Sequence, residues 1–310
     1  MKIGLFFGSG IGAPTISALV EEVVQAEEEG FESFWLAQIF GPEVLSVITI
    51  AGHKTTRIEL GTAVVPTFPR HPMTMAQEAL TAQSASNGRL TLGIGLSHQI
   101  TVEDGWGLSF DKPVTHMREY LTILRALIRD GAVDFVGELF KVNGSIAVPG
   151  ATACPILIAA LGPQMLRVAG ELADGTVTWM AGPRTLESHI IPRISQAARE
   201  VGRPTPRISV GVSVAVTNKP EDVKTSISND LHVYGRLPSY RRLLDIEKVS
   251  HPHDLAIIGD ESTVERKLQQ FSDMGASDLL ITPFPFGSDP LSKETRLRTR
   301  KFASSLVGRF

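Results

Sequence analysis

The sequence predicts an α/β protein folded as a (β/α)8 TIM barrel with insertions, in which residues 1–310 form one domain. Strand-like and helix-like patterns alternate along the chain, and eight strands can be counted, each followed by a helix. The length of 310 residues is usual for such a barrel. TIM barrels keep their active sites where strands end, so those junctions are the first places to search for function.

The first half of the chain supplies four of the strands. Apolar, β-branched and aromatic residues predict strands at 2–8, 31–37, 57–66 and 89–96. Apolar residues at helical spacing predict helices at 13–30, 43–55, 71–88 and 113–130. A hairpin expected at 133–150 interrupts the alternation and is therefore the first insertion.

The second half resumes the alternation. Strands are expected at 155–161, 175–181, 207–217 and 277–284, with helices at 163–173 and 184–202, a helical stretch after 217 and a terminal helix. The stretch at 231–249 interrupts the pattern and carries Tyr234, Arg236, Tyr240, Arg241 and Arg242. These side chains could cover a substrate or bind an acidic group, although charged helix faces are usually solvated.

Composition excludes several classes of function. The net charge is -3, with acidic and basic residues interspersed, so we expect neither nucleic acid nor a membrane surface as partner. Cys154 is the only cysteine, and no cysteine or carboxylate cluster accompanies His251 and His253, so we expect no disulfide framework and no metal. The short apolar run at the N-terminus resembles neither a membrane span nor a signal peptide, and we expect a cytoplasmic protein.

The strand at 57–66 ends abruptly, because Pro66, Pro69 and Pro72 fall within seven residues. Proline cannot continue a central strand, whereas Pro72 suits the first turn of a helix. The sequence therefore predicts a strand end, a shaped loop and a helix start at this point.

Small residues recur on one face of several strands. They are Gly4 and Gly8, Gly61 and Ala63, Gly93 and Gly95, and Ala159. If these faces point inward, the top of the barrel is hollow and suits a broad, planar ligand that backbone can approach closely. The alternative is that small residues only ease the packing of strands.

Three motifs in order carry a resemblance over nearly the whole chain. "GTAVVPTFPRHP", "NGRLTLGIGLSH" and "PILIAALGPQMLRVAGELADGTV" resemble the bacterial luciferase-like superfamily, and within it the branch that uses the deazaflavin coenzyme F420. Sister groups bind FMN in the same place, so FMN is the alternative cofactor. The resemblance implies a bulge at the end of the third strand, where Thr62, Ala63 and Val64 back the coenzyme ring and the Ala63–Val64 peptide bond is cis.

The resemblance also assigns the coenzyme's side chain to two loops. Gly95, Leu96, Ser97 and His98 follow the fourth strand, and Ser97 and His98 could donate hydrogen bonds to a phosphate. Ala159, Ala160, Leu161, Gly162 and Pro163 follow the fifth strand. Because Pro163 begins a helix, free N–H groups near Gly162 could hold an anion, although each motif alone is usually structural. Thr178, on the sixth strand, could reach the rim of the site.

The sequence departs from the family pattern at the end of the second strand. Sugar-phosphate dehydrogenases of the deazaflavin branch have a motif resembling Ser-Asp-His there, and its histidine serves in alcohol oxidation. This chain has Ala37, Gln38 and Ile39, and neither an amide nor an alkyl group can take a proton from an alcohol. Gln38 could bind a polar group or serve only as a hydrogen-bonding strand end. We identify no catalytic acid or base.

These observations predict an F420-dependent oxidoreductase that transfers hydride between the deazaflavin and a small organic substrate, in the direction of reduction. The alternatives are an FMN-dependent luciferase-like monooxygenase and a non-catalytic flavin-binding protein. The resemblance and the apolar helix at 43–55 also predict a homodimer.

Overall fold

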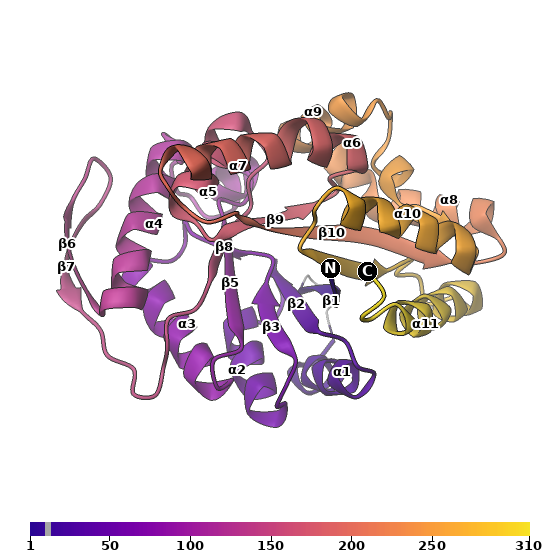
Figure 1. The fold of residues 1–310 in the computed structure, drawn as a ribbon, viewed down its shortest axis with the longest axis horizontal. Coiled ribbons are helices and arrows are strands. Elements are labelled where there is room, and N and C mark those ends of the chain that lie inside the picture. Colours follow the sequence, from indigo (N-terminus) through magenta and orange to yellow (C-terminus); the bar gives the residue numbers. More distant parts are fainter. Residues whose placement is uncertain (10–13) are drawn as a thin grey trace.

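The structure is a computed structural model that describes residues 1–9 and 14–310. It confirms the predicted barrel, because eight parallel strands of the described chain close into a ring that helices surround (Figure 1). The strands are β1 (Lys2–Ser9), β2 (Ser33–Gln38), β3 (Glu59–Thr62) continued by β4 (Val65–Pro66), β5 (Leu90–Gly95), β8 (Ile156–Ile158), β9 (Gly175–Trp179), β10 (Arg207–Val216) and β12 (Asp278–Pro283). β12 closes the ring by pairing with both β10 and β1.

The helices of the barrel lie where amphipathic patterns predict them. They are α1 (Ile16–Glu28), α2 (Val44–Lys54), α3 (Pro72–Ala85), α4 (Pro113–Asp130), α5 (Pro163–Leu172), α6 (Pro183–Thr185) with η2 (Leu186–Ile190) and α7 (Ile191–Glu200), α8 (Pro220–Leu231), α10 (Glu261–Asp273) and α11 (Pro290–Ser305). Proline occupies the first turn of α3, α4 and α5, where its missing N–H costs nothing. Residue 13, where the first expected helix begins, lies outside the described residues.

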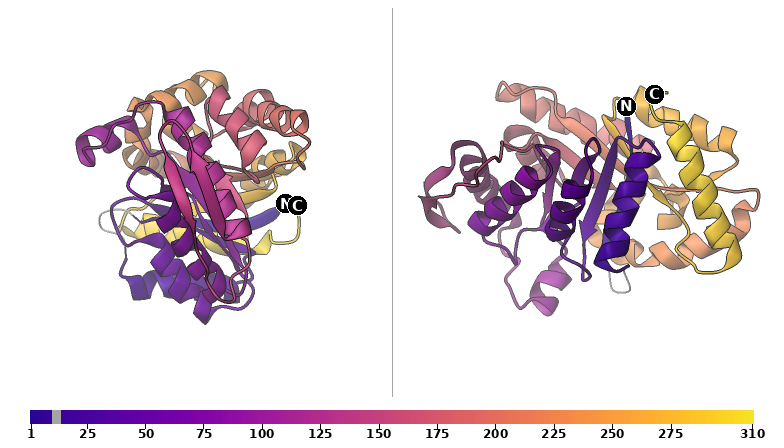
Figure 2. Two further views of the ribbon diagram at one scale, coloured as in Figure 1. Left: turned by 90° about the vertical axis from the view of Figure 1, so that its left-hand side faces the viewer. Right: turned by 90° about the horizontal axis from the view of Figure 1, so that it is seen from below.

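Two additions flank α4: a short π-helical turn before it, and the expected hairpin, which is the first insertion, after it. The turn is η1 (Thr101–Gly105), and the antiparallel strands are β6 (Ala132–Val136) and β7 (Lys141–Ser145). The hairpin projects from the barrel beside α4 (Figures 1 and 2). Glu119 of α4 holds its tip, because the carboxylate accepts hydrogen bonds of 2.7 to 2.9 Å from the N–H groups of Glu138, Leu139 and Phe140.

The second insertion lies between α8 and α10. It contains η3 (His232–Arg236), α9 (Pro238–Glu247), η4 (Pro252–Leu255) and β11 (Ile257–Gly259). β11 pairs in parallel with the far end of β10, outside the ring. We did not predict β11, because three residues carry too little periodicity to distinguish a strand from a loop. Glu247 anchors α9 by accepting hydrogen bonds from the backbone N–H groups of Arg184 and Thr185, at 3.2 and 2.8 Å.

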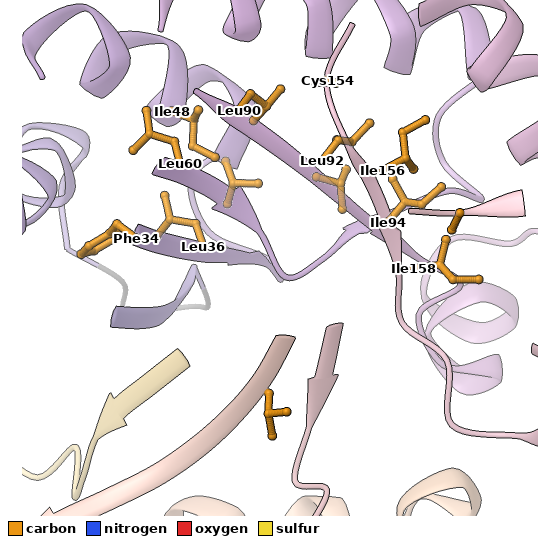
Figure 3. Packing of buried hydrophobic residues seen from close by; sticks show 14 of the residues in the cluster. Phe34, Leu36, Ile48, Leu60, Leu90, Leu92, Ile94, Cys154, Ile156 and Ile158 are labelled. Atoms are coloured by element: carbon orange, nitrogen blue, oxygen red, sulfur yellow. The ribbon is translucent and has the colours of Figure 1, made fainter. Parts of the chain in front are cut away.

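Apolar side chains fill both sides of the strands. The larger cluster packs between the strands and the surrounding helices and includes Leu36, Leu60, Leu92 and Ile158 (Figure 3). A smaller cluster fills the inside of the ring with Phe6, Trp35, Leu157, Val177 and Leu280. The inner cluster establishes which face of each strand points toward the barrel axis, because side chains alternate along a strand.

A buried ionic network occupies the end of the barrel where the strands begin. Arg207 lies 2.6 Å from Glu59 and forms a two-pronged ion pair with Asp278, which is fully buried. Burial favours the neutral form of Glu59, but its bonds to Arg207 outweigh that effect and lower its pKa. These charged groups are all bonded to one another and leave no free partner for a ligand. The candidate site is therefore sought at the opposite end of the barrel, where the strands end.

The two ends of the chain meet beside the barrel (Figure 1). The amino group of Met1 donates a hydrogen bond of 2.8 Å to the carbonyl of Phe310. Among the described residues, every helix is too short or too polar to cross a membrane.

Candidate functional site

The third strand contains a β-bulge. Gly61 pairs with Thr91 before it, and Val65 pairs with Ile94 after it, so residues 62–64 lie opposite residues 92–93. One extra residue on one strand defines a bulge, and bulges are common beside active sites. The peptide bond between Ala63 and Val64 is cis. The bulge and the cis bond that the family resemblance implied are both confirmed.

Thr62 supports the bulge from within the barrel wall. Its hydroxyl donates to the carbonyl of Gly93 at 2.7 Å and accepts from the N–H of Gly93 at 2.8 Å. It therefore replaces the ladder bonds that the bulge interrupts. The N–H of Ala63 donates to Leu36 of β2 at 2.8 Å, so the bulge is fixed on both sides. The Thr62 hydroxyl is consumed by these bonds, and Thr62 acts on a ligand only through the bulge that it holds.

Small residues form a bed next to the bulge. A β-carbon on Gly95 would lie 2.6 Å from the Cγ2 atom of Val64 and 3.3 Å from the Cβ atom of Ala159. A β-carbon on Gly93 would lie only 1.9 Å from the carbonyl oxygen of Thr62. Strand packing therefore explains Gly93, as one of the two alternatives proposed. Gly95, at the end of β5, instead lets Val64 and Ala159 lie close together, as a hollow barrel mouth requires.

The loop after β5 adds polar groups to this bed. Ser97 has a left-handed backbone, with φ of 64°, and turns the chain away from the strand. The carbonyl of His98 then accepts hydrogen bonds from Thr101 and Val102, which start η1. Burial lowers the pKa of His98, so its ring is neutral near pH 7 and offers a hydrogen bond rather than a positive charge. Leu96 packs partly buried against the outer core.

The loop after β8 presents the start of a helix to the same region. Gly162 is the N-cap of α5, no side chain caps the helix there, and Pro163 follows as its first residue. The first turn therefore has free N–H groups and a positive end of the helix dipole, which favour an anion. The imidazole Nε2 of His189 donates to the carbonyl of Leu161 at 2.7 Å and steadies the loop. Ala160 is fully buried and contributes only backbone.

Arg242 brings a positive charge to the start of α5. One guanidinium nitrogen of Arg242 lies 3.7 Å from the place of a β-carbon on Gly162. The neighbouring Arg241 is engaged elsewhere, with Asp245 and with the carbonyls of Val249 and Ser250. The sequence indicates both arginines as candidates. Only the contact between α9 and the β8–α5 loop shows that Arg242, and not Arg241, lies beside the start of α5.

Aromatic residues of β9 and of the second insertion line another part of the barrel mouth. Trp179 contacts Phe6 edge-on, with 5.2 Å between ring centroids, and lies 6.3 Å from Tyr234 of η3. Tyr240 of α9 lies 5.1 Å from Tyr234 and 6.0 Å from the ring of His98. The second insertion therefore covers part of the barrel mouth with aromatic side chains. This cover is the contribution of the stretch at 231–249 to the site.

The two remaining candidates, Gln38 and Thr178, do not present their side chains to this arrangement, so the expectation that Thr178 reaches the rim of the site is wrong. The side-chain oxygen of Gln38 accepts a hydrogen bond of 2.9 Å from the N–H of Val44, so it supports the start of α2. Thr178 alternates with the inward-facing Val177 and Trp179, which places its hydroxyl on the outer face of β9. That hydroxyl is buried without a hydrogen-bond partner. Within residues 1–9 and 14–310, no three histidine, cysteine or acidic side chains gather as metal ligands would.

Comparison with known proteins assigns the family. The family model described as luciferase-like monooxygenase matches residues 1–281. The chain belongs to the luciferase-like monooxygenase family. The bulge, the bed of small residues and the two loops lie at the ends of the strands in this luciferase-like barrel, where enzymes of this fold place their sites.

Relatives of the luciferase-like chain differ in the chemistry that their names describe. A 5,10-methylenetetrahydromethanopterin reductase of Archaeoglobus fulgidus is 36% identical over 163 residues, which are 52% of this chain and 49% of the relative. The solved coenzyme F420 dependent tetrahydromethanopterin reductase of Methanopyrus kandleri is 20% identical, with a TM-score of 0.77 over 99% of this chain and 98% of its own. The FMN-bound oxygenating constituent of 3,6-diketocamphane monooxygenase of Pseudomonas putida is 19% identical, with a TM-score of 0.76 over 100% and 98%.

Proposed function

We propose that this protein is an F420-dependent oxidoreductase that reduces a small organic substrate. The observation that carries the proposal is the bed formed by the Ala63–Val64 bulge, Gly95 and Ala159, which lies beside the uncapped start of α5. A bed of small residues beside free N–H groups suits a planar ring with a charged tail. The reductase name of the Archaeoglobus fulgidus relative supports the same reaction class.

The chain's own residues fit such a coenzyme. Ala63 and Val64 would support one face of the ring, because Gly95 leaves them no competing side chain. Free N–H groups at the start of α5, the guanidinium of Arg242 and the neutral ring of His98 would hold a phosphodiester. When bound, the deazaflavin supplies the hydride. The protein positions the reactants and excludes water. Holding the reacting atoms near contact distance lowers the activation barrier substantially.

Reduction is favoured over alcohol oxidation by the end of β2. Gln38 is a neutral amide whose oxygen already accepts from Val44, and Ile39 is an alkyl group. Neither can remove the proton of an alcohol. Hydride addition to an activated carbon–carbon double bond gives an enolate, which can take its proton from bulk water after the hydride has moved, so this reduction needs no acid from the protein.

The nearest rival is an FMN-dependent monooxygenase, which the family description and the FMN-bound Pseudomonas putida structure favour. The bed described above would accept either tricyclic ring. A non-catalytic flavin-binding protein is the second rival, because the described mouth contains no assigned catalytic acid or base.

Two measurements test the proposal. Direct titration of the purified protein with F420 and with FMN should give the lower dissociation constant for F420. Equal or tighter binding of FMN would overturn the cofactor assignment. Reduced F420 should then be oxidised only when an acceptor from a panel of enones, imines and ketones is added. Tight coenzyme binding without turnover on any acceptor would favour the non-catalytic reading.

A further inference from the structure

The mouth of the barrel has an apolar side away from the loops that follow β5 and β8. Ile39 and Phe40 follow β2, and Phe286 follows β12; these three residues are the apolar rim. They are 44%, 57% and 53% exposed. β1 lies between the two strands and pairs with both, so the rim spans three neighbouring strand ends.

The end of β1 brings one side of the rim to the barrel axis. Gly8 is exposed, and a β-carbon placed on it would lie 3.3 Å from the Cδ1 atom of Ile39. Ile39 therefore lies against the end of β1. Gly8 shares the inward face with Phe6 of the inner cluster, so the rim continues directly into the barrel mouth.

The backbone that presents Phe286 is held by polar contacts. Its N–H donates to Asp230 of α8 at 3.0 Å, and Arg296 of α11 donates to the carbonyls of Pro285 and Gly287. The ring of Phe286 packs on the buried Phe284 at 4.1 Å between centroids. An exposed aromatic ring on a constrained backbone loses little conformational freedom when a ligand covers it.

Charge is absent from the chain segments that carry the rim. No charged residue occurs at positions 37–42 or 279–288. The acidic residues that follow are both occupied as helix caps. Glu43 accepts from the N–H groups of Leu45 and Ser46, and Asp289 accepts from the N–H of Ser292. Asp230 and Arg296 are the charged side chains that contact the backbone at Phe286, and both already bond to it. A charged substrate group would therefore lose its hydration at the rim without gaining a free partner there.

We propose that the apolar rim binds the body of the substrate, and that this substrate is an uncharged, largely apolar molecule. That the bound molecule is a substrate rests on the proposed function, whereas its apolar, uncharged character is inferred from the rim alone. The mouth is thereby divided: Arg242 and the start of α5 take the charged tail of the coenzyme, and the ends of β12, β1 and β2 take the apolar substrate.

A matched pair of probes tests this inference by binding, without turnover. Benzylideneacetone and its para-carboxylate share an enone and a ring and differ by one charge. Each is titrated calorimetrically into protein loaded with oxidised F420 or FMN, whichever binds, or into the free protein if neither does. We expect benzylideneacetone to bind at least about tenfold more tightly than the carboxylate. Equal binding, tighter binding of the carboxylate, or no binding of either probe would overturn the inference.

Phe286→Ser locates the binding surface. It should weaken benzylideneacetone binding about tenfold while the affinity for the coenzyme is unchanged. The control is Val201→Ser, because Val201 is 52% exposed but follows α7 at the opposite end of the barrel. An unchanged probe affinity in Phe286→Ser would overturn the inference. So would a change from dimer to monomer with no effect on the probe, since the rim would then be an interface between copies of this chain.

The same data distinguish the two failures. Tighter binding of FMN than of F420, with the probe preference intact, would overturn the proposed cofactor and leave the apolar substrate site standing. Tight F420 binding with a preference for the carboxylate would leave the proposed cofactor standing and overturn the apolar substrate site.

Discussion

A β-carbon placed on Gly95 would lie 2.6 Å from the Cγ2 atom of Val64, which is closer than two carbon atoms can approach. The absence of a side chain at Gly95 therefore determines where Val64 lies. Val64 belongs to the bulge that we assign to the coenzyme ring. The glycine at the end of β5 therefore controls where the bulge between β3 and β4 can lie.

The first prediction is that Gly95→Ala weakens F420 binding by at least about tenfold, because the new methyl group pushes Val64 into the space of the ring. Binding is measured by absorbance titration, and unfolding by circular dichroism shows that the barrel still folds. The matched variant Gly95→Ala with Val64→Ala removes the obstructing Cγ2 atom and should recover part of the affinity. Unchanged binding in Gly95→Ala would show that Gly95 serves strand packing alone.

The second prediction concerns Arg242, whose guanidinium lies beside Gly162. Arg242→Gln should weaken F420 binding about fivefold to tenfold and reduce its dependence on salt, because a screened charge interaction is lost. Riboflavin lacks a phosphate, so any affinity for riboflavin should not change. Arg236→Gln is the control, since it removes an exposed charge from the same insertion. Equal losses in the two variants would point to general electrostatic attraction instead of a contact.

The third prediction concerns His116 of α4. Its ring stacks on Phe68 at 4.1 Å between centroids, and its Nε2 lies 3.0 Å from the hydroxyl of Thr67. Burial lowers the pKa of His116 from 6.5 to about 4, although the nearby Glu119 opposes the shift. A proton then binds the unfolded chain more readily, so the stability contributed above pH 6.5 is lost as the pH falls toward 4.

This pH dependence is measurable in a variant. A shift of this size corresponds to at most about 3 kcal/mol of unfolding free energy. His116→Phe keeps an aromatic ring on Phe68 but cannot titrate, so its unfolding free energy should fall less than that of the original protein between about pH 7 and about pH 4. Urea unfolding at a series of pH values checks this. Parallel curves for the two proteins would mean that His116 does not carry the effect.

The fourth prediction is a homodimer, with a mass twice that of the 33.5 kDa chain. The helix at 43–55 no longer supports it strongly, because Val44, Leu45, Val47 and Ile48 of α2 are buried within the chain. Ile50 alone among its large apolar residues is 44% exposed. The family resemblance is the remaining reason for the prediction. Light scattering at working concentration measures the mass, and a monomer would contradict the prediction.

Much of the candidate site could be predicted from local sequence. The prolines after Val65 require a strand end and a helix start wherever they occur, since proline restricts its own backbone. Pro163 after Gly162 similarly marks the start of α5. The cis bond at Ala63 came from the family resemblance, because nothing in the local chemistry of these residues requires it.

The sequence by itself determined the elements of the barrel and their order, because hydrophobic periodicity and proline act over a few residues of neighbouring chain. Only the tertiary structure decided which strand faces point inward. Alternation divides Thr178 from Trp179, but closure of the ring determines that Trp179 faces the axis. Tertiary structure likewise brought Arg242 to Gly162 and Tyr240 to His98, since such contacts depend on how distant segments pack and leave no periodic signal in the chain.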